Sequence, residues 1–257
     1  MSVVPGIRMA IGTMTAIPVR GPSQIDRSVA RIAMISAAPA ALLIAMPAAA
    51  IGWALSLIAV PPFGCGVIIV GLVAWLSRGL HLDGLADTAD ALSASWSSER
   101  ALEVMKRSDI GPMGVITLVI VLVAQIAAIA SILSRPWGAV VVVVAIVVSR
   151  MSLAIACHAS VPAARPNGLG ATVAGVLSTP VSAVVIAVGL ILGGVSSLIG
   201  GGLWWGGLIA AAVAFGGAAA LVLHCVRRLG GITGDVLGAS IETLSVLLLV
   251  GLSACMG

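Results

Sequence analysis

The chain has 257 residues, of which 60% are hydrophobic and only 9% are charged, and its formal net charge is +4 at pH 7. A chain this apolar cannot display most of its residues to water, so a water-soluble globular protein is excluded. The basic residues are dispersed along the chain rather than gathered in one stripe, which argues against a nucleic-acid partner. Long apolar runs rich in Leu, Ala and Gly favour helices over a membrane β-barrel.

A helix needs about 20 apolar residues to cross roughly 30 Å of hydrocarbon. Seven stretches qualify and predict an all-α, polytopic helix bundle that forms a single membrane domain over residues 1–257. The first stretch is too long for one simple helix and contains Pro39 and Pro47, so we expect a broken helix, or a span followed by a re-entrant piece. The predicted spans are 29–60, 63–80, 111–133, 137–157, 180–199, 203–223 and 236–256.

The basic residues also predict an orientation in the lipid bilayer. If the N-terminus is cytoplasmic and each stretch crosses once, all but one of the 13 Lys and Arg residues fall on the cytoplasmic side, and the exception is Arg135. We therefore expect a multi-pass protein of the cell membrane with its N-terminus inside and its C-terminus outside. Residues 1–24 lack a compact apolar core followed by a cleavage site, so we expect no removable signal peptide.

The acidic residues are concentrated after the second span. Six of the nine lie between Asp83 and Asp109, and Asp83, Asp87 and Asp90 follow an i, i+4, i+7 spacing. If the second span continues as a helix, these three carboxylates share one face. Two carboxylates about 6 Å apart repel each other by roughly 3 kcal/mol at an effective dielectric constant near 20, so a cation is needed there.

Hard carboxylate oxygens suit Mg²⁺ or Mn²⁺. The alternative is that these residues are solvated charges at a helix end, but no basic residue interrupts the run from Asp83 to Asp90. We therefore place the chemistry in residues 81–114, on the cytoplasmic side.

Two basic, glycine-containing segments are candidates for binding phosphate. The first holds Lys106 and Ser108 just before the third span, and it could equally be only the positive flank of that span. The second begins at Arg228 and continues through the Gly-rich residues 230–234. Arg150 interrupts an apolar span, where it could either snorkel to the interface or clamp a phosphate.

Three further residues extend these candidate sites. Asp235 and Glu242 lie in or just before the last span, and a carboxylate inside a membrane helix is usually functional. Arg165 precedes a Gly-containing turn in a loop predicted on the same side of the membrane. We assign Arg165, Asp235 and Glu242 to substrate or phosphate binding.

Several of these motifs, in this order and spacing, resemble one family, the membrane-embedded cobalamin-5′-phosphate synthases, also called adenosylcobinamide-GDP ribazoletransferases. The resemblance covers most of the chain. The segments that carry it are 17–19, 79–90, 99–106, 110–114, 164–170 and 228–238.

The resemblance implies transfer of the adenosylcobinamide phosphate group from adenosylcobinamide-GDP to α-ribazole or α-ribazole 5′-phosphate, with Mg²⁺. GMP is released, and the product is adenosylcobalamin or its 5′-phosphate. On this basis Asp83, Asp87 and Asp90 would bind the metal, and Asp90 would also accept the proton of the ribazole hydroxyl. Arg228 or Lys106 would neutralise the departing GMP. The protein could act as a homo-oligomer, which the sequence leaves open.

Two other classes of membrane protein share some of these features. A CDP-alcohol-type phosphotransferase also uses an Asp-rich helix, but it should carry Arg where this chain has Asp87. An ion-coupled transporter would place its carboxylates near the bilayer midplane, between inverted repeats. The sequence leaves both of these classes open as alternatives.

Overall fold

The computed structural model describes residues 2–94, 97–106 and 109–256, and most of these residues are helical. The elements are α1 (Val3–Met14), α2 (Arg27–Ala40), α3 (Leu42–Leu57), α4 (Pro62–Leu76), α5 (Leu80–Ala94), α6 (Ser98–Val104), α7 (Pro112–Leu133), α8 (Gly138–Ser149), the 3₁₀ helix η1 (Arg150–Ser152), α9 (Leu153–Ala156), α10 (Leu169–Val173), α11 (Thr179–Ile199), α12 (Trp204–Leu229) and α13 (Gly234–Cys255). Apart from two isolated bridges, the described residues form no β-structure. The predicted all-α fold is confirmed.

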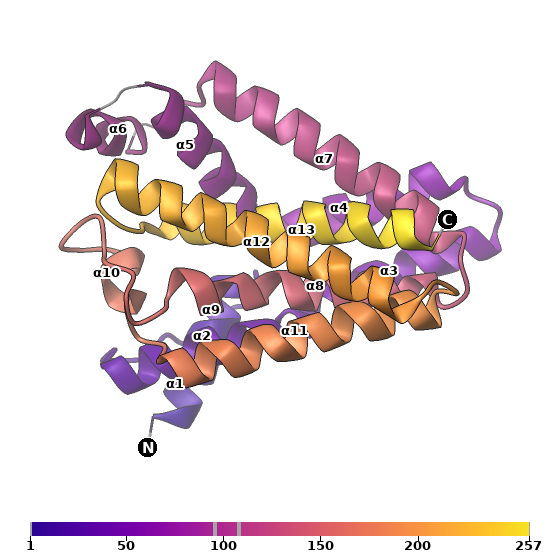
Figure 1. The fold of residues 1–257 in the computed structure, drawn as a ribbon, viewed down its shortest axis with the longest axis horizontal. Helices are drawn as coiled ribbons and strands as arrows, with labels where there is room; N and C mark the ends of the chain where they lie inside the picture. The colour runs from indigo at the N-terminus through magenta and orange to yellow at the C-terminus, as the bar shows by residue number, and fades with distance from the viewer. Residues whose placement is uncertain (1, 95–96, 107–108, 257) are drawn as a thin grey trace.

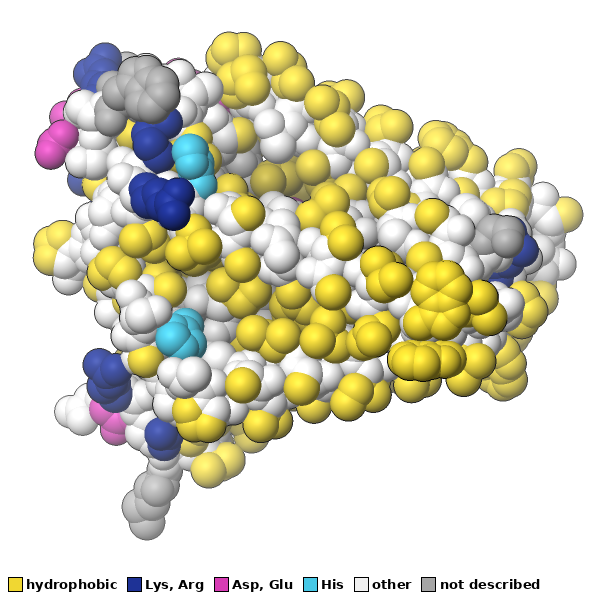
Figure 2. Space-filling view, in the orientation of Figure 1, with side chains coloured by type: hydrophobic (Ala, Val, Ile, Leu, Met, Phe, Trp, Pro, Cys, Tyr) yellow, Lys and Arg dark blue, Asp and Glu magenta, His cyan; other side chains and the backbone are white. Residues whose placement is uncertain are grey.

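The long helices run side by side, and α5, α6 and α10 lie together at one end of the bundle (Figure 1). Six segments of the described chain are long and apolar enough to cross a membrane, and the bent pair α4 and α5 would add a seventh. Hydrophobic side chains cover the flank of the bundle, whereas most charged side chains visible from this side gather at the end that holds α5 and α6 (Figure 2). An apolar surface of this extent is stable only against lipid, so the predicted multi-span membrane bundle is confirmed.

The first predicted span is interrupted but keeps its direction. α2 and α3 together form a stretch of 31 residues, Arg27–Leu57. The interruption lies at Ala41, between Pro39 and Pro47, which both sit inside helices. The broken helix is therefore confirmed, and the alternative of a re-entrant piece is wrong.

The second predicted span does not continue straight into the Asp-rich segment as expected. α4 and α5 meet at 89°, at a turn where Arg78 and Gly79 have φ of +58° and +68°. The guanidinium of Arg78 donates to the carbonyl of Gly12 at 2.7 Å, and the N–H of Ala16 donates to the carbonyl of Leu76 at 2.5 Å. These bonds fasten α1, a helix that the sequence did not predict, to the bend. The Asp-rich segment therefore forms a helix of its own.

α12 is longer than the predicted span, which ended at residue 223. The helix continues through Arg227 and Arg228, which lie in its last turn, where positive charge is favourable. It ends at Gly230, whose φ of +82° suits a glycine C-cap. The polar residues after 223 therefore belong to the helix and not to a loop.

α5 crosses the first turns of α13 at very close range because two glycines face the opposite backbone. A Cβ at Gly84 would lie 2.6 Å from the carbonyl oxygen of Asp235, and one at Gly238 would lie 3.0 Å from the Cα of His81. Small residues permit this approach between membrane helices. The crossing brings Asp235 beside the Asp-rich helix.

Gly84→Ala is therefore expected to destabilise the protein by about 1–3 kcal/mol, because the added methyl group meets backbone that cannot move aside alone. The measurement is the thermal unfolding temperature of the protein in detergent. Gly71→Ala on α4 is the matched control, since a Cβ at Gly71 meets nothing within 4 Å. The control should be neutral or slightly stabilising, and equal unfolding temperatures for the two variants would contradict the tight crossing.

Candidate active site

Four carboxylates lie near one another where α5 crosses α13. Asp83 is exposed, Asp87 is half-buried and Asp90 is buried on α5, and Asp235 lies in the first turn of α13. Burial, followed by the negative charges of the other three carboxylates, raises the pKa of Asp87 to about 6 from 3.8. The positive charge of Arg165 lowers the pKa of Asp87 and so opposes this shift. The predicted spacing thus does bring the α5 carboxylates together, and α13 adds a fourth.

Both carboxylate oxygens of Asp90 are already engaged. One accepts the N–H of Gly111 at 2.7 Å and the other accepts the N–H of Gly114 at 2.8 Å. These N–H groups belong to the start of α7, where the helix itself supplies no acceptor. A side chain at either glycine would collide with the carboxylate. Asp90 therefore holds the start of α7 against α5, and its roles as metal ligand and proton acceptor stay predictions.

A small cavity lined by glycines adjoins the carboxylates. The loop before α10 is held to the turn between α12 and α13, because the Ala164 N–H donates to the Ile232 carbonyl and the Ile232 N–H donates to the Pro162 carbonyl, each at 2.9 Å. This pairing places Arg165, whose guanidinium also donates to the carbonyl of Leu102 at 2.7 Å. The cavity has a volume of about 270 Å³, and we call it the glycine cavity. Its lining residues are Arg165, Asn167, Gly168, Leu169, Gly170, Ile232, Thr233, Gly234 and Asp235.

A second cavity, of about 320 Å³, adjoins the first and shares Leu169, Gly234 and Asp235 with it. We call it the methionine chamber. Its other lining residues are Gly12, Thr13, Met14, Met34, Arg78, Leu80, His81, Asp83, Leu237, Gly238 and Ile241. Sequence reasoning missed the contribution of α1 and α2, because Met14 and Met34 are indistinguishable in the sequence from ordinary core residues.

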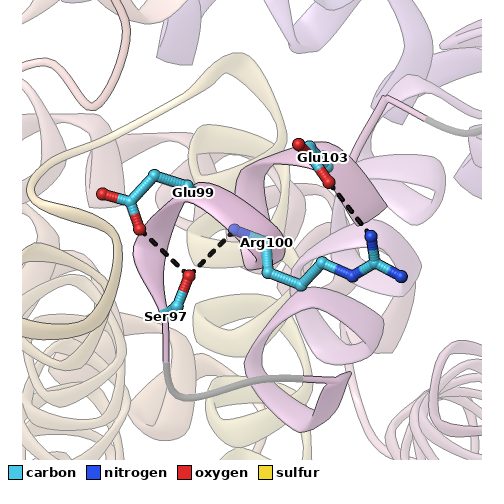
Figure 3. Close-up of polar contacts among 4 residues, drawn as sticks. All are labelled: Ser97, Glu99, Arg100 and Glu103. Carbon is cyan, nitrogen blue, oxygen red and sulfur yellow. Dashed lines mark hydrogen bonds and ion pairs between the residues drawn. The ribbon is translucent and has the colours of Figure 1, made fainter.

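α6 follows α5 in the chain and carries polar contacts among its own residues (Figure 3). The Ser97 hydroxyl accepts the N–H of Arg100 at 3.2 Å and donates to Glu99 at 3.0 Å. Arg100 forms an ion pair with Glu103 at 3.2 Å, with side chains 61% and 67% exposed. Such an exposed pair contributes at most about 1 kcal/mol. The attachment of α6 to the bundle comes instead from the bond between Arg165 and the Leu102 carbonyl and from the buried side chains of Ala101 and Met105.

The predicted phosphate-binding cations are found in different surroundings. Lys106 is exposed at the end of α6. Arg228 is half-buried, and its guanidinium donates to the carbonyl of Leu92 near the end of α5, at 3.4 Å. Ser108 lies outside the described residues. Arg165 and Arg228 thus both contact the α5–α6 region, at Leu102 and Leu92.

Glu242 and Arg150 lie inside the bundle rather than at its charged end. Glu242 is 7% exposed and accepts a hydrogen bond from Gln125 at 2.8 Å. Arg150, only 2% exposed, donates to the Ser149 hydroxyl at 2.8 Å and lies 3.4 Å from Nδ1 of His81. Arg150 therefore does not snorkel to the interface, contrary to the first expectation, and it does not line the glycine cavity. Its role in clamping a phosphate stays a prediction. The assignment of Glu242 to substrate binding stays a prediction.

Comparison with known proteins decides the family. The family model described as cobalamin-5-phosphate synthase matches residues 6–253. The chain belongs to this family. An adenosylcobinamide-GDP ribazoletransferase from Nocardioides sp. is 40% identical over 237 residues, covering 91% of this chain and 92% of its own. One from Frankia casuarinae is 37% identical over 261 residues, covering 95% and 92%. No solved structure matches.

The carboxylates of this cobalamin-5-phosphate synthase family member suit a divalent cation only if other ligands complete its coordination shell. Among the described residues, no three His, Cys, Asp or Glu side chains stand close enough to hold a metal by themselves. Mg²⁺ commonly takes only one or two protein carboxylates and completes its shell with phosphate oxygens and water. Asp83, Asp87 and Asp235 are suitable oxygen donors, none of them ion-paired within the described ranges.

Asp90→Asn tests the anchoring of α7. The amide keeps one acceptor oxygen but turns an NH₂ group toward the second helix-start N–H, so one buried donor loses its partner at a cost of about 1–3 kcal/mol. We expect a lower thermal unfolding temperature and faster proteolysis between residues 105 and 111. Asp109→Asn, an exposed acid of the same segment, is the control and should change stability by less than about 0.5 kcal/mol. Equal stability of the two variants would remove the anchoring role of Asp90.

Proposed function

We propose that this protein is an adenosylcobinamide-GDP ribazoletransferase of cobalamin biosynthesis. In this reaction the adenosylcobinamide phosphate group passes from adenosylcobinamide-GDP to α-ribazole or its 5′-phosphate. The family match over residues 6–253 carries this proposal, since it spans every segment that builds the candidate site. Membership of the cobalamin-5-phosphate synthase family also favours this activity over a CDP-alcohol phosphotransferase or a transporter.

The bond changes of the reaction define what the site must do. A ribose hydroxyl oxygen of the ribazole forms a bond to the phosphorus that stays with cobinamide, and the bond from that phosphorus to the GMP oxygen breaks. GMP leaves with the bonding electrons, and the hydroxyl proton passes to a carboxylate of the cluster. The protein contributes chiefly by aligning the two substrates and by balancing charge.

The described residues divide these tasks between them. The guanidinium of Arg165 and the backbone of the glycine cavity would bind phosphate oxygens. Lys106 and Arg228, at the edge of the same region, would neutralise the departing GMP. Asp83, Asp87 and Asp235 would hold Mg²⁺, which when bound would neutralise charge on the pyrophosphate.

We further propose that the charged end of the bundle faces the cytoplasm. Of the 13 Lys and Arg residues, only Arg135 lies in a loop that would then be outside, which agrees with the rule that positive residues stay inside. The N-terminus would then be cytoplasmic and the C-terminus external. A nucleotide substrate in the cytoplasm would then have direct access to the carboxylates.

The test is release of GMP by the protein purified in detergent, supplied with adenosylcobinamide-GDP and α-ribazole 5′-phosphate. We expect GMP and the 5′-phosphate of adenosylcobalamin to form in equal amounts, to stop when EDTA removes divalent cations, and to resume when Mg²⁺ is added. No GMP from folded protein would reject the activity. Undiminished GMP release in EDTA would leave the activity standing and reject the role of Mg²⁺.

The same assay in sealed membrane vesicles tests the orientation. Both substrates are charged and do not cross lipid, so inside-out vesicles should be active and right-side-out vesicles should be active only after detergent is added. Activity of intact right-side-out vesicles would show that the charged end faces outward.

A further inference from the structure

The methionine chamber has no part in the phosphate chemistry described above, although Asp83 and Asp235 both line it. We infer that this chamber binds the benzimidazole base of α-ribazole, while the glycine cavity receives phosphate. The inference rests on the proposed function, because it assigns one of that reaction's substrates to one cavity. It gives α1 and α2 a role in substrate selection.

The size of the chamber excludes the largest part of the substrates. At about 320 Å³ the chamber is at the lower end of the range for ligand pockets, roughly 300–1,000 Å³. A corrin macrocycle with its side chains cannot enter a space of this size, whereas a bicyclic base can. The two bases in the reaction are the guanine of the donor and the benzimidazole of the acceptor.

The walls distinguish between these two bases. Most of the chamber is apolar, and Met14, Met34 and Ile241 are each less than 5% exposed. Only Thr13, Arg78, His81, Asp83 and Asp235 of the lining carry polar side chains. The donors and acceptors of a guanine that lie against the apolar walls would lose water without replacement. The benzimidazole of α-ribazole presents two fused apolar rings and a single free ring nitrogen. Methionine side chains also pack well on flat aromatic surfaces.

The order of the cavities matches the order of groups in the nucleoside. The methionine chamber and the glycine cavity meet at Asp235, and Asp83 lines the chamber. A nucleoside whose base fills the chamber would place its ribose at this boundary. Its hydroxyl groups would then lie at the carboxylates, and a 5′-phosphate or the donor pyrophosphate would reach the glycine cavity.

His81 adds an independent observation. It lines the chamber, is 5% exposed, and its Nε2 is buried without a hydrogen-bond partner among the described residues. Because Arg150 can only donate, the contact at Nδ1 makes that nitrogen the acceptor and leaves the proton of a neutral His81 on Nε2. A buried donor without a partner is unfavourable. The free ring nitrogen of benzimidazole is an acceptor of the kind that this donor lacks.

Met34→Ala tests the inference, with Met9→Ala as the matched control. Met34 and Met9 are 4% and 6% exposed in the same hydrophobic core, but only Met34 lines the chamber. Met34→Ala should raise KM for α-ribazole about tenfold, because several apolar contacts with the base are lost, and should leave KM for adenosylcobinamide-GDP within about twofold. Binding of α-ribazole alone, measured by calorimetry, should weaken by the same factor. Met9→Ala should leave both KM values unchanged.

Met34→Leu, which nearly conserves volume, serves if the Ala variant does not fold, and should raise KM for α-ribazole by about two- to threefold. A rise in KM for adenosylcobinamide-GDP instead would place the donor in the chamber and overturn the inference. So would unchanged KM values for both substrates in an active enzyme. Failure of the wild-type protein to catalyse transfer would instead overturn the proposed function, a result that the variants cannot mimic.

Discussion

The close crossing of α5 over α13 is the constraint on which the candidate site depends. Gly84 and Gly238 remove the side chains that would separate the two backbones, and Asp235 thereby joins the carboxylates of α5. The resulting repulsion is not relieved by an ion pair within the described residues. It is tolerated because packing and hydrogen bonds fix the helices, and it is the repulsion that the proposed Mg²⁺ would relieve.

The residues around the crossing divide into those that hold α5 and those that face the cavities. Asp90 joins α5 to the start of α7, and Arg228 contacts the carbonyl of Leu92 near its end. At its beginning, His81 meets Arg150 inside the bundle. Asp83 and Asp235 line the two cavities, and Asp87 adds a third negative charge on α5. α5 is thus secured at both ends, which suits a helix that must present carboxylates in a fixed arrangement.

Much of this architecture could be predicted from the sequence, because long apolar runs and i, i+4, i+7 spacing are local signals. The sequence did not predict the 89° bend between α4 and α5, because Arg78 at the turn has a positive φ that arginine rarely adopts. The last turns of α12 were missed because Arg227 and Arg228 resemble a loop unless their place at a helix C-terminus is known. The inward position of Arg150 and both cavities arise from tertiary packing, and no local pattern encodes them.

The central claim is that carboxylates from α5 and α13 act as one centre. The most direct measurement is the transfer rate of Asp87→Asn, Asp235→Asn and the double variant, each shown to be folded. If the two residues act together, each single change should lower kcat by about 100-fold or more, and the double change should cost little beyond the worse single change. Near-normal turnover of Asp235→Asn, or single effects that simply multiply in the double variant, would contradict a shared centre.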